Sequence, residues 1–186
     1  MPLPDRIHVL GASGSGTSSL AREIARRYGH RHLDTDDYFW LPTSPPFREK
    51  RPVEQRLSLL HDAFRESSAW VLSGSLCGWG DPLVPEFRLV VFLDVPTPIR
   101  LERLARRERG RYGAEAIAPG GSLHRAHEEF LDWAAQYDTG GPEMRSRAMH
   151  EAWLAGIACP VVRLEGDVTA TEQIRRIEAQ LRPQAT

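Results

Sequence analysis

The chain has 186 residues, of which 41% are hydrophobic and 26% are charged, so it can bury a core of one compact domain. Its formal net charge of -1 gives no general attraction to nucleic acid or to an anionic membrane. The apolar runs are shorter than a membrane span, and the first residues show no signal-peptide pattern. Cys77 and Cys159 form no C-x-x-C pair and are expected to be reduced thiols. We therefore expect a single cytoplasmic domain over 1–186, a monomer or homodimer, with neither nucleic acid nor a membrane as partner.

Apolar periodicity alternates between strand and helix along the chain. The run 7–10 predicts a buried strand, and residues 18–28 predict a helix that ends at Gly29. Further strands are predicted at 32–34, 70–72, 89–93 and 160–164, and helices at 53–64, 98–108, 124–137, 143–154 and 170–181, with a Gly/Pro-containing connector at 110–121. This order predicts a doubly wound α/β fold whose ligands bind at the carboxyl ends of parallel strands.

A glycine-rich segment joins the first predicted strand to the first predicted helix. It fits the phosphate-loop pattern G-x-x-x-x-G-K-[ST] at every fixed position except that of the lysine, where Thr17 stands. Glycines allow backbone N–H groups to surround phosphate oxygens, and the helix dipole attracts anions, so binding needs no side chain. The missing lysine removes a charge-assisted hydrogen bond worth about 1.5–3 kcal/mol. The predicted nucleotide-binding residues are Gly11, Ser13, Gly14, Ser15, Gly16, Thr17 and Ser18.

Two other interpretations of this segment are a plain connecting turn and a dinucleotide fingerprint. Three glycines between a buried strand and an amphipathic helix argue against the plain turn. The fingerprint would find its ribose-binding acid in Asp34 or Asp36, about twenty residues beyond the turn. However, the last glycine comes one residue too early for G-x-G-x-x-G, and Lys50 is the only lysine in the sequence. An NAD(P)-binding protein is therefore the less favoured alternative.

With these motifs, the chain resembles the P-loop small-molecule kinases, the group of adenylate, shikimate and gluconate kinases. The resemblance rests on the glycine-rich segment 11–18, the acidic run 34–37, the loop 73–75, the arginine-rich stretch 103–111 and the turn 165–167. It implies a P-loop NTPase three-layer sandwich with five parallel strands in the order 2-3-1-4-5 and an arginine-rich lid at about 107–125. It also implies ATP and Mg²⁺ as cofactors. Thr17 departs from the family pattern.

The acidic run Asp34-Thr35-Asp36-Asp37 follows the second predicted strand. A carboxylate at this edge of the sheet can orient the water shell of magnesium or accept the proton of an attacking hydroxyl. We predict catalytic roles for Asp34 and Asp36, and the resemblance implies that Ser18 and Asp36 contact the metal. The alternative is a solvated turn whose aspartates cap a helix.

The stretch 100–111 carries six arginines. On a helix, Arg100, Arg103 and Arg107 share one face. A guanidinium group can neutralise the charge of a transferring phosphate and raise the rate by about 10³–10⁵-fold. We predict that Arg103 and Arg107 are catalytic and replace the missing lysine, whereas a solvated Arg/Glu helix is the alternative.

Two further segments suit an acceptor molecule. Aromatic residues at 38–47 precede three basic side chains, and together they can bind a ring or an anion, although a satellite hydrophobic cluster explains the aromatics equally well. The glycine-rich loop 74–80 resembles the acceptor loop of shikimate-type kinases, although a plain connecting loop is the alternative. The predicted substrate-binding residues are Arg48, Lys50, Arg51, Ser75 and Trp79.

Two classes of function agree with these features. An ATP-dependent phosphotransferase of the adenylate/shikimate kinase type explains Ser18, the acidic run and the arginines together. A catalytically weak or inactive nucleotide-binding sensor explains Thr17. We predict the enzyme, acting on a nucleotide and a small-molecule acceptor.

Overall fold

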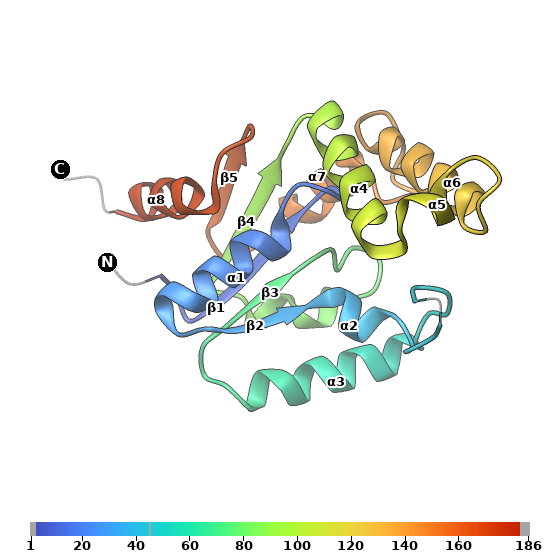
Figure 1. Ribbon diagram of the computed structural model, residues 1–186. Coiled ribbons are helices and arrows are strands. Elements are labelled where there is room, and N and C mark those ends of the chain that lie inside the picture. The colour runs from blue at the N-terminus through green and yellow to red at the C-terminus, as the bar shows by residue number, and fades with distance from the viewer. Residues whose placement is uncertain (1–2, 45, 183–186) are drawn as a thin grey trace.

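The computed structural model describes residues 3–44 and 46–182. Its centre is a five-stranded parallel sheet in the order β2-β3-β1-β4-β5 (Figure 1). The strands are β1 (Arg6–Gly11), β2 (Arg31–Asp34), β3 (Trp70–Ser73), β4 (Leu89–Asp94) and β5 (Val161–Glu165). The predicted α/β class and the 2-3-1-4-5 order are thus confirmed. Because β3 lies beside β1, the sheet differs from the usual dinucleotide-binding order, in which the second strand takes that place.

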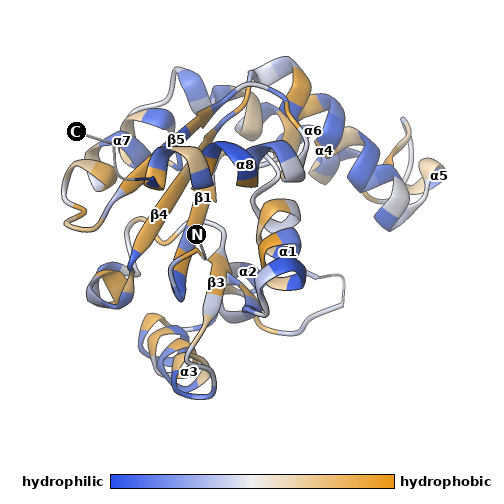
Figure 2. Ribbon diagram, turned by 90° about the vertical axis from the view of Figure 1, so that its left-hand side faces the viewer, coloured by the Kyte–Doolittle hydropathy of each residue, from blue (hydrophilic) through white to orange (hydrophobic). Residues whose placement is uncertain are grey.

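Helices cover both faces of the sheet and make three layers. Alternate residues of each strand point to opposite faces, so Ile7 and Val9 of β1 pack beneath α1 (Thr17–Tyr28) and α8 (Ala170–Leu181). Leu10 belongs to the other face, beneath α3 (Val53–Arg65) and α7 (Arg147–Ala155). The central strands β1 and β4 are mainly apolar, and the surrounding helices carry hydrophilic residues as well as hydrophobic ones (Figure 2). This pattern is typical of a parallel sheet buried on both faces.

The remaining elements lie between these layers and at one end of the sheet (Figure 1). They are α2 (Thr35–Phe39), the 3-10 helix η1 (Asp81–Glu86), α4 (Thr97–Tyr112), α5 (Ala114–Ile117), α6 (His124–Ala135) and the 3-10 helix η2 (Gln136–Asp138). α4 packs against both α5 and α6. Within the described ranges, no helix combines the length and the apolar character needed to cross a bilayer.

Three predicted boundaries were wrong. The helix expected at 143–154 begins at Arg147, because the Ser146 side chain caps it by accepting a hydrogen bond from the Met149 N–H at 3.0 Å. The connector expected at 110–121 is partly helical, since α4 continues through Gly110 to Tyr112. Burial of Leu104 on this helix outweighs the low helix propensity of one glycine. The helix expected at 124–137 ends as an α-helix at 135 and continues as the short η2.

Candidate active site

The phosphate loop runs from the end of β1 to the first turn of α1. Gly14 and Gly16 have φ angles of 82° and 96°, a region that favours glycine. Gly16 is the N-cap of α1, and neither a side-chain cap nor an acidic residue occupies the first turn. The N–H groups of that turn are therefore not engaged by a cap, and with the helix dipole they form an anion-binding end.

Arginines of α4 hold the outer side of this loop. The Arg100 side chain is fully buried and donates hydrogen bonds to the carbonyls of Val95 at 2.9 Å and Ser13 at 3.4 Å. Arg103 donates to the Gly14 carbonyl at 3.3 Å and pairs with Asp167. Both guanidinium groups therefore bind loop carbonyls. The catalytic contact predicted for Arg103 is not supported by this position, which instead makes Arg103 a positioning residue for the loop.

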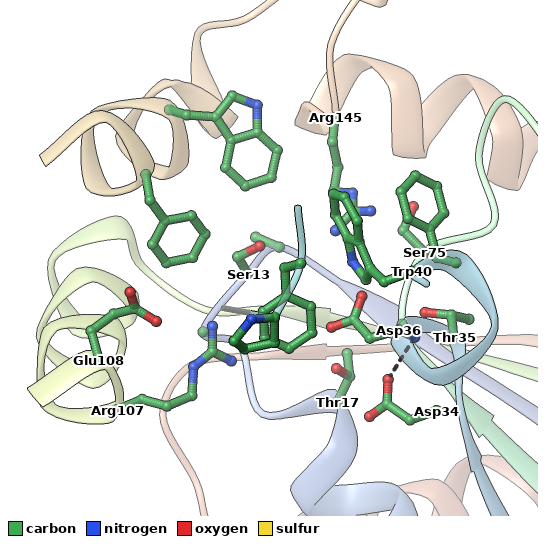
Figure 3. A pocket seen from close by; sticks show the side chains of 18 of the residues that line it. Ser13, Thr17, Asp34, Thr35, Asp36, Trp40, Ser75, Arg107, Glu108 and Arg145 are labelled. Carbon is green, nitrogen blue, oxygen red and sulfur yellow. Dashed lines mark hydrogen bonds between the residues drawn. The ribbon is translucent and has the colours of Figure 1, made fainter. Parts of the chain in front are cut away.

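Asp34 links the loop to the end of β2. Its carboxylate accepts hydrogen bonds from the hydroxyls of Ser18 at 2.6 Å and Ser73 at 3.0 Å, and from the Asp36 N–H at 3.1 Å. The last bond, drawn in Figure 3, caps α2, so Asp34 is a capping residue as well as a neighbour of the loop. The acidic run is thus the first turn of a helix, fixed in place by two strands and the phosphate loop.

Asp36 and Arg107 line one cavity at this edge of the sheet. The two side chains point into the same space, above Thr17 (Figure 3). The surrounding protein and the neighbouring carboxylate of Asp34 raise the pKa of Asp36. Removal from bulk water, together with nearby Arg111, lowers the pKa of Arg107. Within the described ranges, Arg107 makes no hydrogen bond or ion pair, so its guanidinium group is available to an anion.

The cavity has a volume of about 600 Å³ and joins the phosphate loop to two aromatic walls. One wall comes from the segment after α2, where the ring of Trp40 lies 4.8 Å from Phe39 and 6.1 Å from Phe47 between centroids. The other comes from α6, where Phe130 and Trp133 are 6.1 Å apart. A cavity with apolar walls and a polar floor is typical of a small-molecule site.

The cavity gathers most of the predicted site residues. The ones that line it are Gly11, Ser13, Gly14, Thr17, Ser18, Asp34, Asp36, Arg48, Lys50, Ser75, Trp79 and Arg107. Ser15, Gly16, Arg51 and Arg103 do not line it. Arg51 instead donates hydrogen bonds to the carbonyls of Tyr38 at 3.0 Å and Trp40 at 3.3 Å, so it holds the aromatic segment in place. A direct contact between Arg51 and an acceptor is therefore not supported.

The sequence did not predict one residue of the cavity wall and one group behind that wall. The first is Arg145, which precedes α7 and points into the cavity (Figure 3), with its guanidinium carbon 5.8 Å from the ring centre of Trp133. The helix expected at 143–154 includes this residue, and a helical position gives no sign that its side chain enters a cavity.

The second group lies behind Ser75. The Ser75 hydroxyl is 3.0 Å from His150 Nε2, and the other ring nitrogen of His150 is 2.8 Å from the Tyr137 hydroxyl. Burial, with Arg145 nearby, lowers the pKa of His150 to about 3, so the ring is neutral at pH 7. This chain of hydrogen bonds fixes Ser75, and no local sequence signal predicts a contact between residues so far apart.

Comparisons with known proteins agree with the class that the sheet order and the loop define. Residues 7–118, more than half of the chain, match the model of the AAA domain family. The chain belongs to this family, and its five parallel strands in the order β2-β3-β1-β4-β5 have the arrangement of the P-loop NTPase fold.

Two relatives and one solved structure illustrate the similarity. The uncharacterized protein YqaC of Bacillus subtilis is 48% identical over 171 residues, covering 92% of this chain and 94% of that protein. The cytidylate kinase of Thermococcus sibiricus is 31% identical over 112 residues, 55% of this chain and 56% of that one. Shikimate kinase from Acinetobacter baumannii in complex with shikimate has a similar fold, with a TM-score of 0.57 and 13% identity over 94% of this chain and 91% of that chain.

Proposed function

We propose that the protein is an ATP-dependent phosphotransferase that moves the terminal phosphoryl group of ATP to a small-molecule acceptor. The observation that carries the proposal is the meeting of the phosphate loop, Asp34, Asp36 and Arg107 in one cavity. Each of these groups suits a step of phosphoryl transfer. Similarity to cytidylate kinases and to shikimate kinase supports the same class of reaction.

Side chains of this cavity have distinct roles in the proposed reaction. Backbone N–H groups of the loop bind the phosphates, and Arg107 neutralises the charge that develops on the transferring group. An acceptor oxygen forms the new bond to the terminal phosphorus, the bond to the bridging oxygen breaks, and ADP leaves. Any proton on the acceptor oxygen passes to Asp36, whose raised pKa suits a general base. Asp34 orients Ser18 by accepting a hydrogen bond from its hydroxyl.

The oxygen atoms of Ser18 and Asp36 fit Mg²⁺, which prefers hard oxygen ligands and keeps several of its waters. No cluster of three or more His, Cys, Asp or Glu side chains that could hold a metal is found in the described part of the chain. This is compatible with an ion held chiefly by nucleotide phosphates. When bound, the ion would supply positive charge between the outer phosphates.

Thr17 favours a second candidate, a nucleotide-binding protein that performs no transfer. Its neutral hydroxyl occupies the lysine position of the phosphate loop and lines the cavity. In the enzyme, Arg107 of α4 replaces that lysine. In the second candidate, nucleotide binding persists and acceptor turnover does not occur.

A phosphoryl-transfer screen separates the two candidates. The full chain is incubated with Mg²⁺, ATP or GTP, and a panel of nucleosides, nucleoside monophosphates and sugar acids, while ADP or GDP release is measured. We expect acceptor-dependent release that Gly16→Val abolishes, because valine strongly disfavours the φ of 96° at this position. Gly156→Val is the control, since a Cβ there meets only ordinary contacts. Binding of ATP without release for any acceptor would overturn the enzyme and favour the second candidate.

A further inference from the structure

A carboxylate and an imidazole lie buried in the cavity wall without hydrogen bonds. Glu108 of α4 is 7% exposed, and its two oxygens lie 3.9 Å from Arg111 Nη1 and 3.9 Å from His127 Nδ1. Both distances exceed hydrogen-bond length. His127 of α6 is 9% exposed, and its Nδ1 has no hydrogen-bond partner among the described residues. Arg111 and His127 thus flank the Glu108 carboxylate at ion-pair distance, and the covered Nδ1 of His127 faces that carboxylate. Because buried polar groups are normally hydrogen-bonded, the carboxylate that His127 helps to position is suited to a donor from outside the chain.

The space in front of this pair has aromatic and aliphatic side chains in its wall. Glu108 and His127 line the same cavity as the phosphate loop, together with the side chains of Tyr112, Leu123 and Phe130. Figure 3 shows the Glu108 carboxylate directed into the cavity from the α4 side, next to Arg107. Aromatic walls favour a planar ring as the occupant, because such a ring can stack against them.

The chemistry of the pair narrows the kind of ring. An ionised carboxylate only accepts hydrogen bonds, so it recognises a ring edge that presents N–H donors. Cytosine, adenine and guanine carry an exocyclic amino group that meets this demand. Uracil and thymine present a single N–H between two carbonyl oxygens, which a carboxylate repels.

Unpaired cations in the same cavity indicate a negatively charged substituent on the occupant. The side chains of Arg48, Lys50 and Arg145 line the cavity, and none makes a hydrogen bond or an ion pair with a residue in the described ranges. Guanidinium and ammonium groups bind phosphate through charge-assisted hydrogen bonds. An acceptor with both a planar base and a phosphate satisfies the two sets of groups at once.

We infer that Glu108 and His127 form a base-recognition subsite, and that the acceptor is a nucleoside monophosphate with an amino-bearing base. The inference rests on the proposed function, because it names the acceptor class of the same cavity. In the resulting reaction, a phosphate oxygen of the monophosphate bonds to the terminal phosphorus of ATP. The bond from that phosphorus to its bridging oxygen breaks, and ADP and a nucleoside diphosphate are released.

Calorimetric titration of the full chain with CMP, AMP, GMP, UMP and dTMP tests the subsite independently of turnover. We expect at least one amino-bearing monophosphate to bind at least about 10-fold more tightly than UMP or dTMP. Glu108→Gln should reduce this ratio to below about 3-fold, because an amide both donates and accepts hydrogen bonds. Glu102→Gln is the matched control, since Glu102 is an exposed residue of the same helix paired with Arg106, and it should keep the wild-type ratio.

Thermal melting confirms that each variant is folded, and Glu108→Asp provides a second, carboxylate-retaining variant that should keep the preference with weaker affinity. Equal affinities for all five monophosphates in the wild type, an unchanged ratio in Glu108→Gln, or no binding of any monophosphate would overturn the subsite. Phosphorylation of a sugar acid without monophosphate binding would overturn this inference and leave the proposed function standing. Selective monophosphate binding without any transfer would overturn the proposed function and leave this inference standing.

Discussion

Replacement of Gly14 by alanine should destabilise the fold through two separate effects. A Cβ at this position would lie 2.6 Å from the backbone carbonyl oxygen of Arg100, a group that cannot move without shifting α4. Forcing extra atoms into such a contact costs about 1–3 kcal/mol. The φ of 82° adds about 1–2 kcal/mol for a residue with a Cβ. Reduced freedom of the unfolded chain offsets about 0.4–1 kcal/mol of this loss, which leaves a net loss of about 1–5 kcal/mol with a midpoint of about 3 kcal/mol.

The assay is thermal unfolding of Gly14→Ala beside Gly110→Ala. A loss of about 3 kcal/mol lowers the melting temperature of a chain this size by about 6–12 °C. Gly110 lies inside α4 with open space around its Cα, so alanine there should raise the free energy of unfolding by about 0.5–1 kcal/mol. The same Gly→Ala change should therefore lower the free energy of unfolding at position 14 and raise it at position 110. A Gly14→Ala protein that melts within about 1 °C of wild type would refute the close contact between the loop and α4.

Three further predictions concern the network, the transfer step and pH. Asp34→Asn should lower the melting temperature by about 4–8 °C, because three donors lose a carboxylate acceptor. Asp37→Asn should leave the melting temperature unchanged. Equal melting temperatures for the two variants would contradict a stabilising role of the hydrogen bonds to Asp34. Arg107→Ala should retain ATP affinity and slow transfer by about 10³-fold or more in steady-state kinetics. Arg109→Ala, a change at an exposed residue of the same helix, should leave both quantities at the wild-type level. A comparable loss of ATP affinity in Arg107→Ala would contradict this role. Burial lowers the pKa of His8 from 6.5 to about 4, so the unfolded chain binds the proton first as pH falls. This group should therefore remove about 1.4 kcal/mol of stability per pH unit between pH 6.5 and about pH 4 in urea unfolding. Equal slopes for wild type and His8→Leu in that window would contradict this prediction.

Local patterns were sufficient to predict the sheet. The apolar run at 89–93 lacks alternation because both faces of its strand are covered, and such an unbroken run is typical of a parallel sheet. Gly29 ends α1 in the left-handed conformation, as its position after the last apolar residue indicates. Helix boundaries were predicted wrongly where a capping side chain, and not the apolar periodicity, sets the first residue of the helix. At Ser146, the hydroxyl donates a hydrogen bond to the preceding loop and caps α7.

The positions of segments 11–18 and 34–37 at the carboxyl ends of β1 and β2 were predictable, because each is a contiguous segment placed by one strand. The sequence could not predict which arginine of α4 enters the cavity. Arg103 and Arg107 share a helical face and differ only in the residues that pack opposite them. Arg103 meets the carbonyl of Gly14, whereas Arg107 meets open space. The local pattern around Glu108 is that of a solvated Arg/Glu helix, because its burial depends on α6, which lies elsewhere in the sequence.

In the proposed enzyme, main-chain N–H groups of 11–18 bind a triphosphate although Thr17 replaces the lysine. A crystal structure of the full chain with Mg²⁺ and a non-hydrolysable ATP analogue tests it most directly. We expect the outer phosphates to lie within hydrogen-bond distance of these N–H groups, with Arg107 turned toward the terminal phosphate. An analogue bound elsewhere, with the loop empty, would contradict it.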